Sequence, residues 1–142
     1  MNKKRICIVC VIMVFGIMAG CFLEEKYENH IPMEPDVVSS ISMNQDQYLT
    51  IVANRDKIED KEEFAELLVK MCRENSFHTI KFSTDRGYAT SIHMQVYLCD
   101  NDIEEAKVAM KIDYVQREYN EKYDICNNPE EFELHVDGEV IN

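Results

Sequence analysis

The segment from Asp60 to Asn75 constrains the fold more than any other part of the chain, because it predicts one amphipathic helix. Asp60 stands three residues before Glu63, the spacing of a capping box, in which a side chain accepts a hydrogen bond from a free N–H group at the helix start. Asn75 suits the left-handed position at the helix end. The apolar residues between them recur at helical spacing and form one stripe: Phe64, Leu67, Leu68, Met71 and Cys72. A helix with a single apolar face must bury that face against another element.

Alternating apolar and polar residues predict the strands that would cover this helix. The alternation occurs in four segments: 48–53, 78–84, 92–98 and 108–114. The fourth segment also has a helical interpretation over 102–122, because Asp102 and Glu105 have capping-box spacing. We favour the strand there and keep the helix as the alternative.

Together these elements predict an α+β fold with one main amphipathic helix on a mostly antiparallel sheet of about four strands. The order is strand-helix-strand-strand-strand, and the first two strands could run parallel through a right-handed crossover. Asn128 and Pro129 predict a short helical turn. The Asp137-Gly138 pair predicts the turn of a terminal hairpin.

The N-terminus has the parts of a secretory signal peptide. Three cations, Lys3, Lys4 and Arg5, precede an apolar run over residues 6–20 that ends in small residues. A membrane-spanning helix needs about 18 or more apolar residues, and this run is shorter. We therefore expect residues 1–20 to be a cleaved signal peptide, with an uncleaved anchor as the alternative.

The last residues of this run, Met18, Ala19 and Gly20, precede Cys21, and the four together resemble the lipobox of bacterial lipoproteins. In that class the cysteine receives a diacylglyceryl group and a peptidase cuts just before it. The resemblance implies that Cys21 is the lipidated first residue of the mature chain, held at the cell membrane on its extracytoplasmic side. Two acyl chains on one residue suffice for durable anchoring, whereas one chain binds only marginally. The resemblance covers only the first 21 residues.

Residues 21–47 are predicted to be the lipidated cysteine and a flexible linker, because they carry two prolines and no sustained periodicity. An edge strand around Val37, Val38 and Ile41 is the alternative. Residues 48–142 would then form one small α+β domain. Removing residues 1–20 takes away three cations and no anion, so the net charge falls from −12 to −15. Such an acidic domain repels phosphate backbones, which argues against nucleic acid as a partner.

No residue pattern predicts catalysis, a cofactor or a metal site. The four histidines show no pairing at i,i+2 or i,i+4, the spacings that place two ligands on one metal. Ser91 and His93 share one predicted strand face, but the sequence shows no acid that would orient the histidine. We therefore name no catalytic residue, no cofactor and no metal ligand.

The sheet face that the helix leaves uncovered is the predicted contact surface. Its central residues are expected to be Lys81, His93, Gln95 and Tyr97, a mixture of aromatic and hydrogen-bonding side chains that suits a protein or glycan contact. An ordinary solvated sheet face is the alternative. The remaining residues expected on this face are Thr50, Val52, Thr79, Ser83 and Lys111.

These observations predict a membrane-anchored envelope lipoprotein with no enzymatic activity. Its partners would be the membrane, through the lipid anchor at Cys21, and another envelope protein or a surface polymer. The first alternative is a small envelope hydrolase, which would need a cleft with catalytic side chains. The second is a tethered structural or inhibitory protein, which a stoichiometric partner would distinguish.

Overall fold

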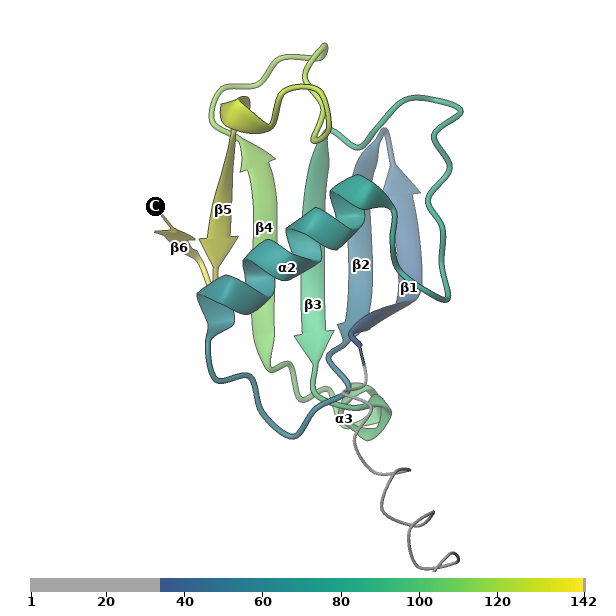
Figure 1. Ribbon diagram of the computed structural model, residues 1–142, viewed down its shortest axis with the longest axis vertical. Helices are drawn as coiled ribbons and strands as arrows, with labels where there is room; N and C mark the ends of the chain where they lie inside the picture. The colour runs from purple at the N-terminus through teal and green to yellow at the C-terminus, as the bar shows by residue number, and fades with distance from the viewer. Residues whose placement is uncertain (1–33, 142) are drawn as a thin grey trace, which may run out of the picture. The chain divides into compact units, whose positions relative to one another are not determined.

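A computed structural model describes residues 34–141 of the protein, in which one sheet of six strands lies against one main helix (Figure 1). The strand order is β1-β2-β3-β4-β5-β6, and every neighbouring pair is antiparallel except β2 and β3, which run parallel. The predicted α+β class with one main helix is confirmed, but the sheet is larger than the predicted four strands. The elements are β1 (Asp36–Met43), β2 (Asp46–Val52), α2 (Lys61–Glu74), β3 (Ser91–Tyr97), α3 (Asp100–Glu104), β4 (Met110–Gln116), η1 (Pro129–Glu131), β5 (Phe132–Val136) and β6 (Glu139–Ile141).

Helix α2 begins and ends where its capping residues predict. The Asp60 carboxylate accepts a hydrogen bond from the Glu63 N–H at 3.0 Å, and Asn75 adopts the left-handed conformation at φ 52°. The buried face differs from the predicted stripe in one position: Leu67 is 40% exposed and lies beside the 55–60 connection. Ala65 and Val69 complete the buried face instead, because the helix packs along the side centred on Leu68.

The predicted linker over 21–47 is wrong in its second half. Strand β1 and the first two residues of β2 lie there, so the alternative of an edge strand around residue 37 is the correct one. Asn44 and Gln45 both have positive φ angles, 50° and 73°, and form the tight turn that joins β1 to β2. Only Val37 of β1 is buried, which explains why the strand has so little apolar signal. Residues 21–33 lie outside the described residues.

The segment 78–84, predicted to be a strand, is part of a loop that runs from residue 76 to residue 90. Side chains take the place of a neighbouring strand: the Asn75 amide bonds both the N–H and the carbonyl oxygen of Phe82, at 2.8 and 3.0 Å. Phe77 is fully buried and makes an edge-on ring contact with Phe82. The apolar residues that suggested a strand therefore fasten a loop to the core. The parallel crossover through the helix consequently joins β2 to β3.

The C-terminal half follows the sequence pattern closely. The strand interpretation of 108–114 is confirmed by β4, although a short helix, α3, occupies residues before it. The helical turn at Pro129 is confirmed by η1. Asp137 and Gly138, with φ of 50° and 87°, form the turn of the predicted terminal hairpin between β5 and β6.

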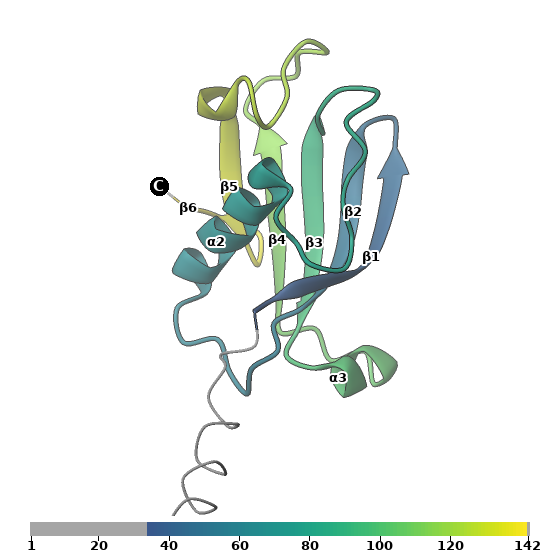
Figure 2. The ribbon, with the colours of Figure 1, turned by 45° about the vertical axis from the view of Figure 1, so that its right-hand side comes forward.

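Helix α2 lies on one side of the sheet, which Figure 2 shows in a turned view. The side chains between the helix and the sheet form the core, with Ile51, Leu68, Ile92, Met94 and Ile112 among its least exposed residues. The opposite side of the strands is here called the open face. Within residues 34–141, every helix is too short or too polar to span a lipid bilayer.

Candidate functional site

The open face gathers three of the four residues predicted for the contact surface. His93, Gln95 and Tyr97 alternate along β3, and the pairing places Gln95 between Thr50 on β2 and Lys111 on β4. Gln95 is exposed, but Tyr97 is only 7% exposed and donates its hydroxyl to the Gln95 side chain at 3.2 Å. Gln95 and His93 are therefore the residues of this group that a partner can reach.

The fourth predicted residue, Lys81, is not on the open face. It lies in the 76–90 loop beside the end of α2, where its ammonium group donates to the Asn75 carbonyl oxygen at 3.1 Å. Thr79 and Ser83 lie in the same loop and leave the face with it. These three assignments were wrong because they assumed a strand where Asn75 and Asp36 hold a loop through side-chain hydrogen bonds.

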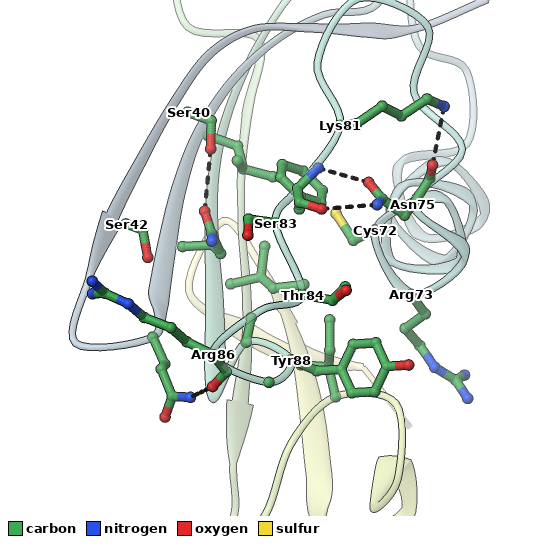
Figure 3. Close-up of a pocket in the computed structure, with 18 of the residues that line it drawn as sticks. Ser40, Ser42, Cys72, Arg73, Asn75, Lys81, Ser83, Thr84, Arg86 and Tyr88 are labelled. Atoms are coloured by element: carbon green, nitrogen blue, oxygen red, sulfur yellow. Dashed lines mark hydrogen bonds between the residues drawn. The ribbon is translucent and has the colours of Figure 1, made fainter.

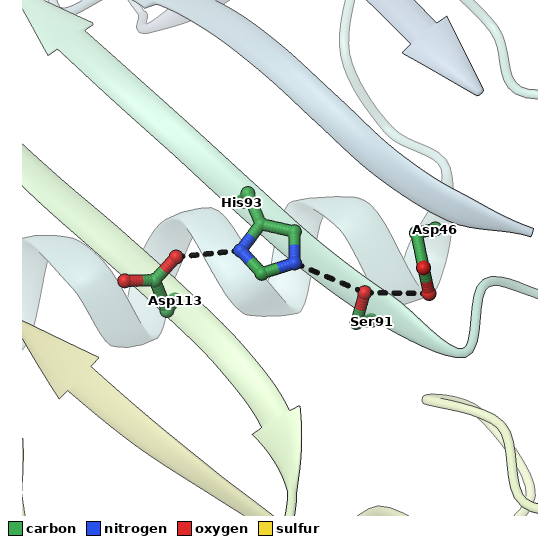
Figure 4. Close-up of polar contacts among 4 residues, drawn as sticks. All are labelled: Asp46, Ser91, His93 and Asp113. Carbon is green, nitrogen blue, oxygen red and sulfur yellow. Dashed lines mark hydrogen bonds and ion pairs between the residues drawn. The ribbon is translucent and has the colours of Figure 1, made fainter. Parts of the chain in front are cut away.

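A chain of four polar side chains crosses the open face at one end of β3 (Figure 4). Asp113 Oδ1 lies 2.6 Å from His93 Nδ1, and His93 Nε2 lies 3.2 Å from the Ser91 hydroxyl. That hydroxyl lies 2.7 Å from Asp46 Oδ1. The ring of Tyr48 stacks on His93, with 4.9 Å between ring centroids and 17° between planes. The imidazole is thereby held at both nitrogens and on one flat side.

The order acid, imidazole, hydroxyl is that of a nucleophilic triad, in which the imidazole accepts the proton of the attacking hydroxyl. Ser91 has a single hydroxyl proton, and only its donation to Asp46, with the hydroxyl oxygen accepting from His93 Nε2, satisfies both contacts. Asp46 therefore competes with the imidazole for the serine proton. Ser91 is only 8% exposed. The residues that follow it, Ile92 to Val96, are paired with both β2 and β4, so the sheet ladder competes for the N–H groups that an oxyanion hole would use. The geometry thus orients His93 and does not free Ser91 for attack.

The two carboxylates that contact His93 and Ser91 were not foreseen from the sequence, because they lie on strands other than β3. Asp113 faces His93 from β4, and Asp46 faces Ser91 from β2. Both are ordinary carboxylates among 27 in the chain, and only the register of three strands brings them together.

An apolar patch lies next to this polar chain. Ile41 and Met43 on β1 are each 58% exposed, and Tyr48 on β2 is 41% exposed. The pairing sets Ile41 opposite Tyr48, which in turn stands opposite His93. The patch formed by Ile41, Met43 and Tyr48 is therefore continuous with the oriented imidazole.

A cavity of about 740 Å³ lies on the other side of the sheet, between the β1–β2 hairpin, the end of α2 and the 76–90 loop (Figure 3). Buried side chains of Leu49, Ile92 and Ile125 line its floor. Its walls carry hydroxyl groups, among them those of Ser40 and Ser42. The remaining feature of its lining is charge, because three cations border it: Arg73, Lys81 and Arg86.

The cysteines in the described part of the chain are free thiols in three different surroundings. Cys72 is buried, Cys126 is half-buried and Cys99 is exposed. Burial raises the pKa of the Cys72 thiol far above its usual value, and it raises the pKa of Cys126 as well. Cys126 contacts the Arg73 carbonyl oxygen at 3.4 Å. Residues 34–141 contain no group of three or more His, Cys, Asp or Glu side chains placed to hold a metal ion.

Comparisons of the chain with protein-family models, with curated proteins and with solved structures find no match. The residues that resemble a lipobox, Met18, Ala19, Gly20 and Cys21, lie outside the described residues.

Proposed function

We propose that the protein is a lipid-anchored lipoprotein of the cell envelope whose domain is a non-enzymatic binding module for another envelope protein. The lipobox-like residues ending at Cys21 support the anchor. The observation that carries the binding role is the exposed apolar patch of Ile41, Met43 and Tyr48 beside the oriented His93. Aromatic and methionine side chains are enriched in protein interfaces, and exposed apolar side chains that adjoin one another mark contact sites.

The partner that this face fits is a protein surface with an apolar centre and basic groups around it. The apolar patch offers the desolvated centre, and His93 is pre-oriented by its contacts with Asp113, Ser91 and Tyr48, so little conformational entropy is lost on binding. The mature net charge of −15 opposes an anionic polymer and favours a basic partner surface.

The contact can be tested by photo-cross-linking in intact cells. A cross-linking amino acid replaces Gln95 on the open face or, as the matched control, Glu66, an exposed residue of α2 on the other side of the sheet. We expect one stoichiometric cross-linked protein from position 95 and none from position 66. The same product from both positions, or no product from either, would contradict the proposal.

The anchor is tested separately by the intact mass of protein extracted from membranes with detergent. We expect a species that begins at Cys21 and carries added acyl mass, and we expect it to be missing from a Cys21→Ala variant. An unmodified chain that keeps Met1 would show that the N-terminal run is an uncleaved anchor.

The Asp113–His93–Ser91 order favours a hydrolase as the second candidate function. A fluorophosphonate probe, which labels activated serines covalently, separates the two. The binding proposal expects no labelling of the purified protein. Labelling that disappears in a Ser91→Ala variant but survives in a variant of the exposed Ser83 would instead establish the hydrolase.

A further inference from the structure

We propose that the cavity beside α2 binds a small organic anion, in which a phosphate or carboxylate group is joined to an apolar body. This site lies on the opposite side of the sheet from the open face, so it is independent of the protein contact proposed above. It rests on three properties of the cavity: its charge, its two-part lining and the way its walls are held.

Charge is the first property. Among residues 34–141, the cavity is lined by three cationic side chains, Arg73, Lys81 and Arg86, and by a single carboxylate, that of Asp85. The ion pairs formed within residues 34–141 involve none of these three cations. The protein as a whole has a large excess of carboxylates. Around this cavity, however, the cations have no carboxylate partner among the described residues, so an anion is attracted there.

The lining supplies the second property, since it joins polar walls to an apolar floor. Leu49 and Ile92 are 3% and 1% exposed and present hydrocarbon, while Ser40 and Ser42 present hydroxyl groups. The Ser40 hydroxyl donates to the side-chain Oε1 of Gln47 at 3.1 Å. A volume of about 740 Å³ is within the range of sites for small ligands. The ligand that fits has an anionic group for the walls and an apolar or aromatic body for the floor.

The third property is that the loop over the cavity is tied down at both ends. Gln45, in the β1–β2 turn, donates from its side chain to the Arg86 carbonyl oxygen. At the other end Asn75 bonds the backbone of Phe82 at 2.8 and 3.0 Å. A pre-formed wall spares the ligand the entropic cost of ordering it. The arginines themselves are exposed and remain free to turn toward an anion.

The experiment is calorimetric titration of the full chain in non-ionic detergent with 2-naphthyl phosphate, with heats of titration into detergent alone subtracted. We expect saturable one-to-one binding, and about tenfold or greater weakening when 2-naphthol, which lacks the charge, replaces the phosphate. The double variant Arg73→Gln/Arg86→Gln should weaken binding of the phosphate by about tenfold or more. Arg117→Gln, which removes one arginine charge from an exposed position outside the cavity, should leave it within about twofold.

Further probes distinguish the source of the anion. Tighter binding of 2-naphthyl phosphate or 2-naphthoate supports a free solute, and tighter binding of the water-soluble dibutyrylphosphatidylglycerol supports a lipid head group. Either order supports an anion site. Three results would overturn it: equal affinity for 2-naphthol, equal loss in the Arg117 variant and the double variant, or no saturable binding of any anion up to millimolar concentration.

Discussion

The carboxylate of Asp36 connects the start of β1 to the 76–90 loop, and its replacement by Asn is the sharpest test of this part of the fold. Oδ1 accepts hydrogen bonds from the N–H groups of Val37 and His78 at 3.0 and 3.1 Å. Oδ2 accepts from the N–H of Thr79 at 3.1 Å and from its hydroxyl. In Asp36→Asn an NH₂ group replaces Oδ2, so the Thr79 N–H keeps only its 3.2 Å bond to Oδ1, and the Thr79 hydroxyl loses its carboxylate acceptor. The lost bond to a charged group contributes about 1.5 kcal/mol, and the bonds that remain on Oδ1 no longer have a charged acceptor, so we expect a loss of about 2 kcal/mol in unfolding free energy.

Urea unfolding of the full chain in detergent measures this difference, with Asp56→Asn, a change of an exposed carboxylate, as the control. The pH dependence supplies a second readout. Burial acts to raise the pKa of Asp36, but hydrogen bonds from Thr79, Val37 and His78 outweigh it and lower the pKa below its usual value. A pKa lowered by folding means that the stabilisation is complete above the unfolded-state pKa of about 3.9 and is lost as the pH falls through the folded-state value.

We therefore expect the gap between wild type and Asp36→Asn to be constant from pH 6 to 8 and to close below about pH 4. A gap below about 0.5 kcal/mol at pH 7 would refute the connection between β1 and the loop. The same conclusion would follow from a gap that persists unchanged at low pH.

Three further predictions use the same reasoning. Leu68→Ala should cost about 3 kcal/mol of unfolding free energy and Leu67→Ala less than about 1, because only Leu68 is fully buried; the reverse order would mean that the helix is rotated. Asn75→Ala should be less stable in urea than Asn75→Gly by about 1 kcal/mol, because both lose the amide but only Ala is strained in the left-handed conformation; equal stability would argue against that conformation. Iodoacetamide should label the exposed Cys99 in the folded protein and Cys72 only after unfolding, because burial blocks access and raises the pKa; rapid labelling of Cys72, seen by peptide mass, would contradict its burial.

Elements whose own residues carry a local signal with a physical cause, such as a cap or a tight turn, were predicted correctly. The helix was predictable because Asp60 and Asn75 cap it and an apolar face lies between them. The terminal hairpin was predictable because Asp137 and Gly138 have the positive φ angles of a tight turn. Strand β1 was not predictable with the same assurance, because an edge strand with one buried residue has almost no alternation to detect.

The prediction for the loop from residue 76 to residue 90 was wrong for the opposite reason, since this segment has a strand-like alternation but no strand pairing. Its backbone is satisfied by the side chains of Asn75 and Asp36, which lie far from one another in the sequence. No periodicity can reveal such long-range hydrogen bonds. Lys81 was assigned to the wrong side of the sheet through this error, and the cavity that it borders was not foreseen at all.

The cavity follows from the way one helix covers a six-stranded sheet. Helix α2 packs mainly on β4 and β5, so the inner sides of β1 and β2 need another cover. The loop that leads from α2 to β3 provides it, but Phe77, Ile80 and Phe82 anchor that loop at points and not along a continuous face. A point-anchored loop leaves space over the hydroxyls of β1, and its own cations border that space. The connection that completes the core therefore also builds a pocket bordered by cations, which is why the proposed anion site and the loop's hydrogen bonds should be tested together.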